Sequence, residues 1–368
     1  MRRALCLTLA LLLLLCACGK PSAPDKTGGE EIPMRYAEQL RAFRYPGGAV
    51  RLLLGEREEL LLLPAGAEVP AGLEALPQIR TPVERVYLAS SSAGDFFVRL
   101  DALDSLSFSS TRPESWQIPE LKAAMEEGKL LYAGKYSAPD YELLLEEACG
   151  LALENTMLLH TPETREKLEK LGLPLLIEYS SYESHPLGRV EWIKLYGLLT
   201  GKEAEAEAFF EKQCAQVEKS GAAPASGRRA AFFYLGANGA VVVRRKQDYV
   251  TRMIELAGGE SAITEGNDGE GALSTASIQL ESFYAQARDA DVLIYNGTVS
   301  ASPESLEDLL ALCPLLADCR AVREGAVWCT EQSLFQRSAA AGDMIADFRE
   351  ILGDAPDERK LQYFHRLR

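Results

Sequence analysis

The stretch LPLLIEYSSYESHPLGRVEWIK, residues 173–194, joins a predicted strand to the start of a long predicted helix. The first part, LPLLIEY, is a short apolar run that is typical of a buried strand. Pro186 then fits the first turn of a helix. Apolar side chains follow with the spacing of one helical face, at Val190, Ile193, Leu195 and Leu198. The long helix is expected over residues 188–220, because GAAPASGRR after it favours a loop.

Strands and helices alternate on both sides of this stretch. The predicted strands before it lie at 83–89, 130–134 and 151–160, and those after it at 230–236, 241–245, 291–297 and 325–330. The predicted helices before it lie at 90–106, 121–128, 138–149 and 161–172, and those after it at 248–259, 277–290, 305–313 and 341–353. Such alternation is typical of α/β units with parallel strands. The predicted fold class is therefore α/β, with two α/β lobes whose central sheets are mostly parallel and one long interlobe helix.

The lobes are expected at residues 35–187 and 228–354, on either side of the helix at 188–220. Two lobes agree with the length of 368 residues, because single cores stop growing at about 250–300 residues. The first lobe starts with a β-rich prefix at 35–82, in which Gly and Pro interrupt short apolar runs. AVRLLLG and EELLLLPAG are the predicted strands of this prefix.

Residues 1–17 are predicted to be a signal peptide, because two arginines precede an apolar run. The run is shorter than the ~20 residues of a permanent membrane span. The sequence LCAC at 15–18 resembles a bacterial lipobox, which implies cleavage before Cys18, acylation of that cysteine and a place on the extracytoplasmic face of the cell membrane. An ordinary signal peptide with an incidental cysteine is the alternative. Residues 18–34 then form a tether rich in Gly, Pro and Ser.

Charge and cysteine content restrict the function further. The formal charge of −15 argues against nucleic acid as a partner, because phosphate binding needs a basic surface. Beyond Cys18, five cysteines remain, and none of their spacings is that of a metal site. Buried, unpaired thiols are expected, and a disulfide between Cys313 and Cys319 is the alternative.

Three longer motifs follow the lipobox and tether in a characteristic order. AGKYSAPDYELLL precedes a strand, LGLPLLIEYSSYESHPLGRVEWIKLYGLLTG leads into the long helix, and DYVTRMIELAGG lies in the second lobe. In this order they resemble the substrate-binding lipoproteins of ABC importers, in the branch for iron-siderophores, haem and cobalamin. The resemblance covers residues 15–352, and only the prefix at 35–82 lies outside the usual pattern of the family.

The resemblance implies a binding protein that catalyses no reaction and holds no cofactor of its own. The implied partners are an ABC permease with its ATPase and a small-molecule metal complex. A ferric siderophore is the expected ligand, and haem or a corrinoid is the alternative. On this basis Tyr179–His185, after the last strand of the first lobe, should line the mouth of a cleft, because ligands bind at strand carboxyl ends.

Other classes of function are less well supported. Glu183 and His185 could act as base and acid in a secreted α/β enzyme, but no G-x-S-x-G, phosphate loop or G-x-G-x-x-G stands between a strand and a helix. A surface adhesion protein is a further alternative. A bare zinc or manganese site is disfavoured, and no metal ligands are predicted, because the chain has only three histidines.

The candidate ligand residues lie in the first lobe or in the segment 244–249, which starts with the basic cluster Arg244–Lys246. That cluster would bind carboxylates, catecholates or haem propionates through arginine's bidentate fork, and a solvated strand end is the alternative. A core position is the alternative for Trp116, and a hydrogen-bonded loop position is the alternative for His185. The predicted ligand-binding residues are Ser91, Trp116, Lys135, Tyr136, Tyr182, His185, Arg244, Lys246 and Tyr249.

Surface charges are the last group of predicted residues. Arg189, Glu191 and Lys194 are expected on the helix surface, with Glu191 and Lys194 paired at i,i+3. The resemblance also implies one acidic residue on each lobe that docks on arginines of the permease. Glu142 and Glu281 occupy the matching places, each near the start of a predicted helix.

Overall fold

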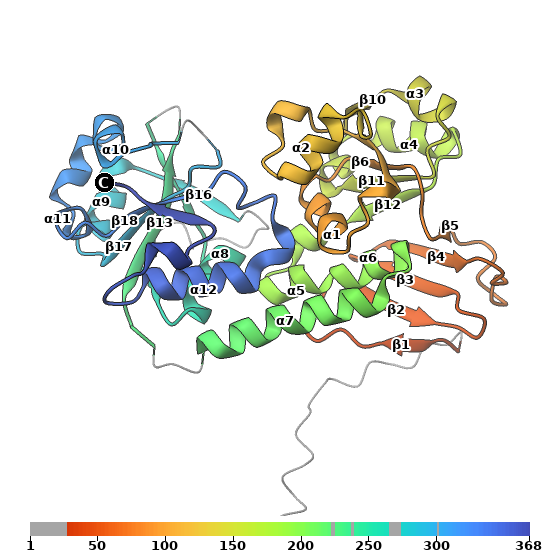
Figure 1. The fold of residues 1–368 in the computed structure, drawn as a ribbon, viewed down its shortest axis with the longest axis horizontal. Coiled ribbons are helices and arrows are strands. Elements are labelled where there is room, and N and C mark those ends of the chain that lie inside the picture. Colours follow the sequence, from red (N-terminus) through yellow and green to blue (C-terminus); the bar gives the residue numbers. More distant parts are fainter. Residues whose placement is uncertain (1–27, 222–224, 237–238, 265–273, 300–301) are drawn as a thin grey trace, which may run out of the picture.

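The computed structural model describes residues 28–221, 225–236, 239–264, 274–299 and 302–368. The predicted signal peptide at 1–17 and the predicted lipidation site Cys18 lie outside these residues. Two lobes stand side by side, with lobe 1 on the right of Figure 1, lobe 2 on the left and a further sheet below lobe 1. No helix in the described ranges has both the length and the apolar character needed to cross a membrane.

Lobe 1 is built on a five-stranded sheet in which all neighbouring strands are parallel. In spatial order its strands are β12 (Leu175–Glu178), β11 (Leu151–Asn155), β6 (Val86–Leu88), β7 (Leu106–Ser109) and β8 (Leu131–Tyr132). Its helices are α1 (Gly94–Arg99), α2 (Pro119–Glu126), α3 (Tyr141–Glu146) and α4 (Pro162–Lys170), and a small hairpin joins β9 (Gly134–Lys135) to β10 (Ala138–Pro139). The strand order reverses between β6 and β11, which is where such sheets bind ligands. Strand β7 is not predicted from the sequence, because it follows directly on a region with helical apolar spacing.

Lobe 2 has a seven-stranded sheet that is parallel at its centre and antiparallel toward its edges. Its strands along the sheet are β16 (Thr275–Ile278), β14 (Val241–Arg244), β13 (Arg229–Leu235), β17 (Val292–Tyr295), β18 (Val327–Thr330) and β19 (Phe364–Arg366), and β15 (Glu260–Ser261) also pairs with β13. Its helices are α8 (Tyr249–Leu256), α9 (Leu280–Ala287), α10 (Leu306–Leu312), α11 (Arg320–Arg323) and α12 (Ala341–Ile351). The predicted fold class, α/β with two lobes, is confirmed.

The prefix forms a third sheet of five strands. In order they are β1 (Glu30–Ile32), β2 (Leu40–Arg44), β3 (Val50–Leu54), β4 (Glu58–Pro64) and β5 (Gln78–Thr81). One face, which includes Leu52, belongs to the main apolar core of the protein. The other face, which includes Phe43, packs against Leu73 from the segment between β4 and β5. Both faces are therefore covered, and the predicted strands of the prefix are confirmed.

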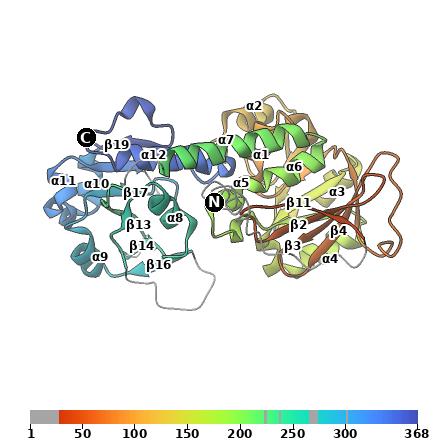
Figure 2. The ribbon, with the colours of Figure 1, turned by 90° about the horizontal axis from the view of Figure 1, so that it is seen from below.

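The connection between the lobes differs from the single helix predicted over residues 188–220. It consists of α5 (Pro186–Glu191), α6 (Ile193–Thr200) and α7 (Glu203–Gly221). Gly201 ends α6 with φ 73°, a left-handed conformation that glycine adopts without strain. Helix α7 then packs on α6 at Gly197, where an added Cβ would lie 2.7 Å from the Cβ of Ala206. Seen from below in Figure 2, α7 crosses from lobe 1 to lobe 2 beside α12.

Glu191 binds the chain just before β2. Its Oε1 accepts from the backbone N–H of Arg35 at 2.8 Å, and its Oε2 accepts from those of Tyr36 and Ala37 at 2.7 and 3.0 Å. Lys194 pairs with the same carboxylate at 3.2 Å. The two segments also touch directly, because a Cβ added at Gly188 would lie 2.9 Å from the carbonyl oxygen of Tyr36.

Glu183 extends this contact by two residues. Its carboxylate accepts from the backbone N–H groups of Glu38 and Gln39, both at 2.8 Å, and from Trp192 Nε1 at 2.9 Å. Burial raises the pKa of Glu183, and the three hydrogen bonds act in the opposite direction. Together Glu183 and Glu191 bind five consecutive N–H groups, so the stretch at 181–194 is a structural joint between the prefix and the interlobe helices.

This joint corrects the expected position of three charged residues. Glu191 and Lys194 form the predicted pair, but their side chains are buried rather than on the helix surface. Arg189 is half-buried, and its guanidinium donates to the carbonyl oxygens of Ser181 and Glu183. The i,i+3 spacing predicted the ion pair between Glu191 and Lys194. It could not predict that the pair is buried, because the segment that covers it lies about 150 residues earlier in the chain.

A second set of contacts joins lobe 2 to lobe 1. The segment before α12 places Arg337 Nη1 3.1 Å from Asp95 Oδ1, and the N–H of Ala339 donates to Asp95 Oδ2 at 3.1 Å. Gln336 accepts from the N–H of Gln117 and donates to the carbonyl oxygen of Ser115. Asp95 is fully buried, so an ion pair and hydrogen bonds compensate its charge at this interlobe contact.

Replacing Glu191 by Gln tests the joint. The change keeps the size of the side chain but removes charge that several buried N–H groups and Lys194 require. We expect the free energy of unfolding to fall by about 3 kcal/mol, and the amides of residues 35–39 to exchange hydrogen faster. Exposed Glu205 on α7 offers a matched control, and Glu205→Gln should change stability by less than about 0.5 kcal/mol. Wild-type stability and exchange in Glu191→Gln would contradict the joint.

Candidate functional site

The carboxyl ends of the lobe 1 strands bring polar residues together at one sheet edge. Ser90 follows β6 and is buried, and its Oγ lies 3.1 Å from Oγ of Ser92. Glu178, at the end of β12, is also buried and accepts from the N–H of Ser180 at 2.9 Å. The Ser90 hydroxyl lies 3.5 Å from the same carboxylate. Burial raises the pKa of Glu178, and the bonds from Ser180 and Ser90 oppose this effect.

The corresponding edge of lobe 2 lies after β17 and β18. Asn296 is fully buried there, and its Oδ1 accepts from the hydroxyl of Thr298 at 2.7 Å. Gly297 donates its N–H to Thr330 Oγ1 at 2.9 Å. A Cβ added at Gly297 would lie 2.9 Å from Cys329 Sγ, so only glycine fits this turn. Both lobes therefore end their central strands in tightly packed polar turns.

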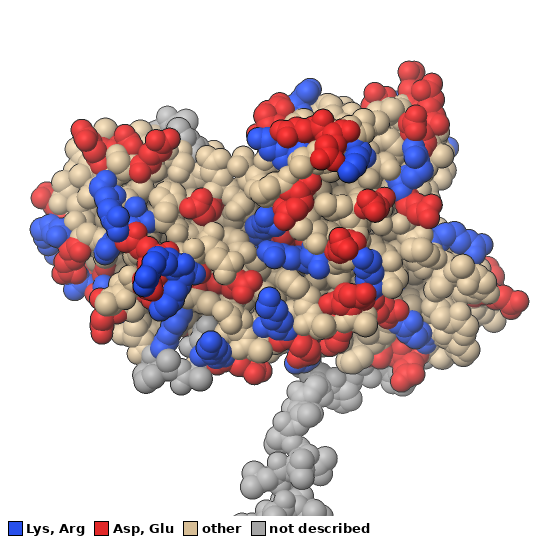
Figure 3. Space-filling view, in the orientation of Figure 1, with Lys and Arg blue, Asp and Glu red and all other residues tan. Residues whose placement is uncertain are grey.

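Large apolar side chains stand exposed at these same edges. Met157 follows β11 and is 48% exposed, Tyr182 follows β12 and is 49% exposed, and Val299 follows β17 and is 54% exposed. Leu159 is a further example on lobe 1. Exposed apolar groups that gather at one place often mark a contact surface. Figure 3 shows a notch between the lobes on the upper side of the molecule, and most atoms that border it belong to uncharged residues.

A cavity lies between the lobes beside the start of α5, and we call it the hinge cavity. It has a volume of about 360 Å³. Lobe 1 contributes the residues before α5, and lobe 2 contributes the turn after β14 and one side of α8. The lining residues are Ser184, His185, Lys246, Gln247, Arg252 and Glu255. Both lobes thus supply donors to one cavity.

His185 is fixed in the wall of the hinge cavity. Its Nδ1 accepts from the N–H of Leu187 at 3.1 Å, which caps α5, and its ring stacks on Tyr36 with centroids 4.7 Å apart. Burial lowers the pKa of His185, and the charge of Arg252 lowers it further. The ring is therefore neutral near pH 7, and its proton is on Nε2 because Nδ1 is an acceptor.

The hinge cavity brings together only two of the predicted ligand residues, His185 and Lys246. Ser91 is half-buried after β6, and Tyr136 packs on the lobe 1 core next to exposed Lys135. Tyr182 is exposed and packs edge to face on Tyr179 at 5.9 Å. These four lie on lobe 1 at or beyond the carboxyl ends of its strands. They remain predictions as ligand residues.

Trp116, Arg244 and Tyr249 lie inside the protein more than at its surface. Trp116 is buried in the lobe 1 core, where a Cβ added at Gly94 would lie 3.2 Å from its ring. Arg244 pairs with buried Asp248 at 3.5 Å. Tyr249 packs under the guanidinium of Arg189, 3.6 Å from the ring centroid, and burial raises its pKa to about 12. Trp116 therefore occupies a core position, which was the alternative to its predicted role in ligand binding.

The direction of β14 explains the position of the basic cluster. Val241 pairs with Leu235 at the carboxyl end of β13, and Val243 pairs with Phe233, so β14 runs back along β13. Arg244 consequently ends β14, and Lys246 follows it, on the side that points away from the carboxyl ends of the parallel strands of lobe 2. Arg244 pairs with Asp248 and lies 4.6 Å from the Phe335 ring centroid, and its role in ligand binding remains a prediction.

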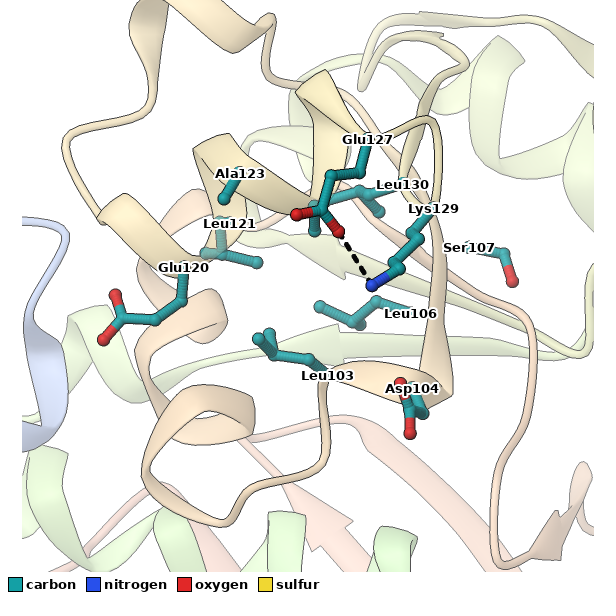
Figure 4. Close-up of a pocket in the computed structure, with 11 residues that line it drawn as sticks. Leu103, Asp104, Leu106, Ser107, Glu120, Leu121, Ala123, Glu127, Lys129 and Leu130 are labelled. Atoms are coloured by element: carbon teal, nitrogen blue, oxygen red, sulfur yellow. Dashed lines mark ion pairs between the residues drawn. The ribbon is translucent and has the colours of Figure 1, made fainter.

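Another cavity, of about 350 Å³, lies on lobe 1 beneath α2 (Figure 4). Leucines form its apolar part, and Lys129 points toward Glu127 at its rim with an ion pair of 2.7 Å. None of the predicted ligand residues lines this cavity. Its walls belong to lobe 1 alone, so it does not share the two-lobed character of the hinge cavity.

Sequence reasoning missed several residues at these sites. Arg252 and Glu255 belong to a predicted helix, and their sequence context is that of ordinary surface charges. Arg252 nevertheless lies one helical turn after the predicted ligand residue Tyr249. Met157 lies in a region predicted as strand, whereas the chain turns into a 3₁₀ helix there. Helix-face spacing from Tyr249 is the one signal that could have identified Arg252.

Metal-binding and redox groups are sparse in the part of the chain that the structure describes. Within it, no three side chains of His, Cys, Asp or Glu are grouped so as to hold a metal ion. Cys313 and Cys319 are both buried and free, so the alternative of a disulfide between them is not realised. The other three cysteines of the described residues, Cys149, Cys214 and Cys329, are likewise buried and free, as expected.

The two predicted docking residues lie on different lobes. Glu142 is in the first turn of α3 on lobe 1, and Glu281 is in the first turn of α9 on lobe 2. Both side chains are exposed. Asp140 caps α3 through the N–H of Leu143, so Glu142 is not needed as the cap. The docking role remains a prediction.

Two α/β lobes, helices that join them and donors from both lobes around an interlobe site define a two-lobed binding protein. The model of the family described as periplasmic binding protein matches residues 151–334, half of the chain. The chain belongs to this family, and the resemblance inferred from the sequence is confirmed.

Solved structures of low sequence identity share the fold. The petrobactin-binding protein YclQ of Bacillus subtilis has a TM-score of 0.59 at 12% identity, covering 74% of this chain and 92% of that one. The periplasmic haem-binding protein HutB of Vibrio cholerae has a TM-score of 0.58 at 16% identity, covering 71% and 97%. The vitamin B12-binding protein BtuF of Vibrio cholerae has a TM-score of 0.53 at 15% identity, covering 74% and 97%.

Two uncharacterized lipoproteins of Methanocaldococcus jannaschii are relatives in sequence. One is 26% identical over 260 residues, which are 68% of this chain and 59% of that protein. The other is 24% identical over 357 residues, which are 91% of this chain and 87% of that protein. The chain thus spans less than two thirds of the first relative and most of the second.

The buried carboxyl of Glu154 on β11 makes lobe 1 sensitive to pH. The side chain is fully buried, neither of its oxygens has a hydrogen-bond partner among the described residues, and burial raises its pKa to about 8 from 4.5. Between about pH 4.5 and about pH 8 the folded state therefore keeps a proton on Glu154, whereas the unfolded state releases it. Stability should fall as pH rises from about 4.5 to about 8, by at most about 1.4 kcal/mol per pH unit.

Glu154→Gln should remove this contribution. Thermal melting between pH 5 and 9 should show that the variant gains stability relative to the wild type as pH rises. Glu146→Gln, at an exposed position on α3, should follow the wild type across the range. If the melting temperatures of Glu154→Gln and the wild type change in parallel over the whole pH range, buried Glu154 carries no proton in the folded state.

Proposed function

We propose that the protein is an extracytoplasmic substrate-binding lipoprotein of an ABC importer. Acylated Cys18 anchors it to the outer face of the cell membrane, and its partners are the permease and ATPase of the importer. Its ligand is a bulky metal complex of the ferric siderophore type, with haem or a corrinoid as the alternative. The protein carries out no chemical reaction in this role. The family and the lipoprotein relatives support this general assignment.

One observation carries the proposal of a bulky ligand. The carboxyl ends of the parallel strands present exposed Met157, Tyr182 and Val299 on two different lobes. Sites for large organic ligands are mostly apolar with few polar groups, and aromatic faces suit such ligands. The mostly uncharged border of the interlobe notch in Figure 3 is consistent with this chemistry. The similar structures include a petrobactin-binding, a haem-binding and a vitamin B12-binding protein, whose ligands are all bulky and metal-binding or metal-containing.

Polar groups at the same edges give the proposed site directed hydrogen bonds. Ser91 and Ser92 are half-buried beside the buried Ser90 and Glu178 pair. Tyr136 and Lys135 follow β8 and supply a hydroxyl and a charge near the surface. A cleft with this mixture would hold the organic shell of a chelate by apolar contact and its oxygens by hydrogen bonds.

Titration of the purified protein with ferric siderophores, haem and cobalamin tests the proposal, with tryptophan fluorescence as the readout. We expect one class of complex to bind, and Tyr182→Ala and Met157→Ala each to weaken binding about tenfold, since each loses an apolar contact of about 1.4 kcal/mol. Leu312 on α10 is 56% exposed but follows no strand, so Leu312→Ala should bind normally. No binding by any of the three classes, or unchanged binding in both strand-end variants, would contradict the proposal.

Docking on the permease is a separate prediction. Glu142 and Glu281 would meet arginines of the transporter, one on each lobe, and opposite charge steers such encounters. Replacing both by Lys should abolish uptake while ligand affinity and melting temperature stay near the wild-type values. The exposed residues Glu205 and Glu324 provide a control with the same change of charge, and their double Lys variant should transport normally. Normal uptake in the Glu142 and Glu281 variant would exclude this docking assignment.

A further inference from the structure

We propose that the cavity beneath α2, which we call the α2 cavity, is a second binding site that takes a small organic ammonium ion with an apolar tail. Its volume of about 350 Å³ is at the lower end of the ~300–1,000 Å³ that is usual for small-molecule sites. All of its walls come from lobe 1, between residues 103 and 130. The inference is therefore independent of the proposed function, which places a metal complex between the lobes.

The floor of the α2 cavity is apolar and well packed. It is lined by Leu106 on β7, Leu121 on α2 and Leu130 after that helix, and all three are at most 5% exposed and belong to the main apolar core. Leu103, from the 3₁₀ turn before β7, is half-buried and lies among them in Figure 4. An apolar tail on this floor leaves water, which improves affinity about fourfold for each buried methylene.

Two alanines of α2 leave the space above this floor open. Ala123 and Ala124 lie between Glu120 and Glu127 on the side of the helix that lines the cavity. Residues at this spacing of i, i+3, i+4 and i+7 share one helical face. A long side chain at position 123 or 124 would extend from this face into the cavity and occupy it. The cavity therefore depends on small residues at the middle of the face.

The charges at the rim of the α2 cavity favour a cation. The lining contains three carboxylates, Asp104, Glu120 and Glu127, and one basic residue, Lys129. Lys129 pairs with Glu127 at 2.7 Å, and Glu120 lies 3.4 Å from Arg337 of lobe 2. Asp104 has no ion pair within 4 Å among the residues that the structure describes. The rim therefore keeps a negative charge after these pairs are counted, and a cation can balance it.

The carboxyl end of α2 adds to this preference. The helix ends at Glu126, and Glu127, Lys129 and Leu130 of the lining follow directly. This end of a helix carries partial negative charge, which stabilises a nearby cation. Lys129 is 72% exposed, so an incoming ammonium group can share the Glu127 carboxylate with it at little cost. In Figure 4 this ion pair lies among the leucines, so a ligand held by Glu127 can place its tail on the floor.

Titration with hexylammonium chloride at constant ionic strength tests the α2 cavity, with backbone amide signals in ¹H–¹⁵N spectra as the readout. We expect the amides of Ser107, Ala124 and Leu130 to shift and saturate, while those of lobe 2 stay in place. Butylammonium has two methylenes fewer and should bind about fifteenfold more weakly. Hexanoate has the same apolar tail as pentylammonium but should not bind, because the rim carboxylates repel it.

A pair of double variants separates the rim from general surface charge. Asp104→Asn/Glu127→Gln should lower the affinity for hexylammonium at least tenfold. Glu114→Gln/Glu126→Gln removes the same charge from exposed positions of lobe 1 outside the lining, and this control should bind like the wild type.

A second pair of variants tests the space itself. Ala123→Leu fills the cavity without changing its charge and should abolish the saturable shifts. Lys122→Leu adds the same side chain at the neighbouring exposed position, which does not line the cavity, and should still bind.

Equal binding of hexanoate and hexylammonium, the absence of saturable shifts at the cavity amides, or equal losses of affinity in the two double variants would overturn the proposal. A melting curve of each variant without ligand shows whether it is folded, and Glu127→Gln alone serves as the milder change. Failure of all metal complexes to bind would affect the proposed function and leave the result with hexylammonium unchanged.

Discussion

Two buried carboxylates, Glu183 and Glu191, hold the prefix sheet to the interlobe helices. Glu183 and Glu191 accept from five consecutive backbone N–H groups at residues 35–39. Buried carboxylates are costly unless they are paired or hydrogen-bonded, and buried N–H groups need acceptors just as strongly. The carboxylates therefore give the N–H groups their acceptors, and the N–H groups give the carboxylates their donors. The charged stretch at 181–194 is a joint, and its two glutamates stabilise the fold.

The joint has consequences for the whole arrangement of lobes. The prefix sheet, α1, the interlobe helices, α8 and α12 share one apolar core that reaches from Leu52 through Trp192 to Phe348. Asp95 and Arg337 add an ion pair between the lobes on the side of α1. A binding site between lobes that are already held in position loses less freedom when a ligand arrives, which favours affinity. The prefix thus acts as a brace for the interlobe helices, and this explains why so much of its surface is buried.

Local patterns in the sequence were sufficient for most strands and helices, because apolar runs, glycines and prolines act over a few residues. The two-lobed α/β fold followed from their alternation. The break at Gly201 was missed, since the helical apolar spacing continues on both sides of it. The burial of Glu191 could not be predicted, because its partners lie about 150 residues away in the chain. The strand-end position of Tyr182 followed from the general rule for α/β sheets, whereas the place of Arg244 required the antiparallel direction of β14.

The absorption spectrum of the protein purified from its native host, and again after incubation with ferric siderophores, haem and cobalamin, tests most directly whether the two lobes hold a metal complex between them. Each of these complexes has its own visible bands, so the spectrum also identifies the ligand. We expect one complex per chain that stays with the protein through gel filtration. A folded protein that remains colourless after every incubation would contradict it.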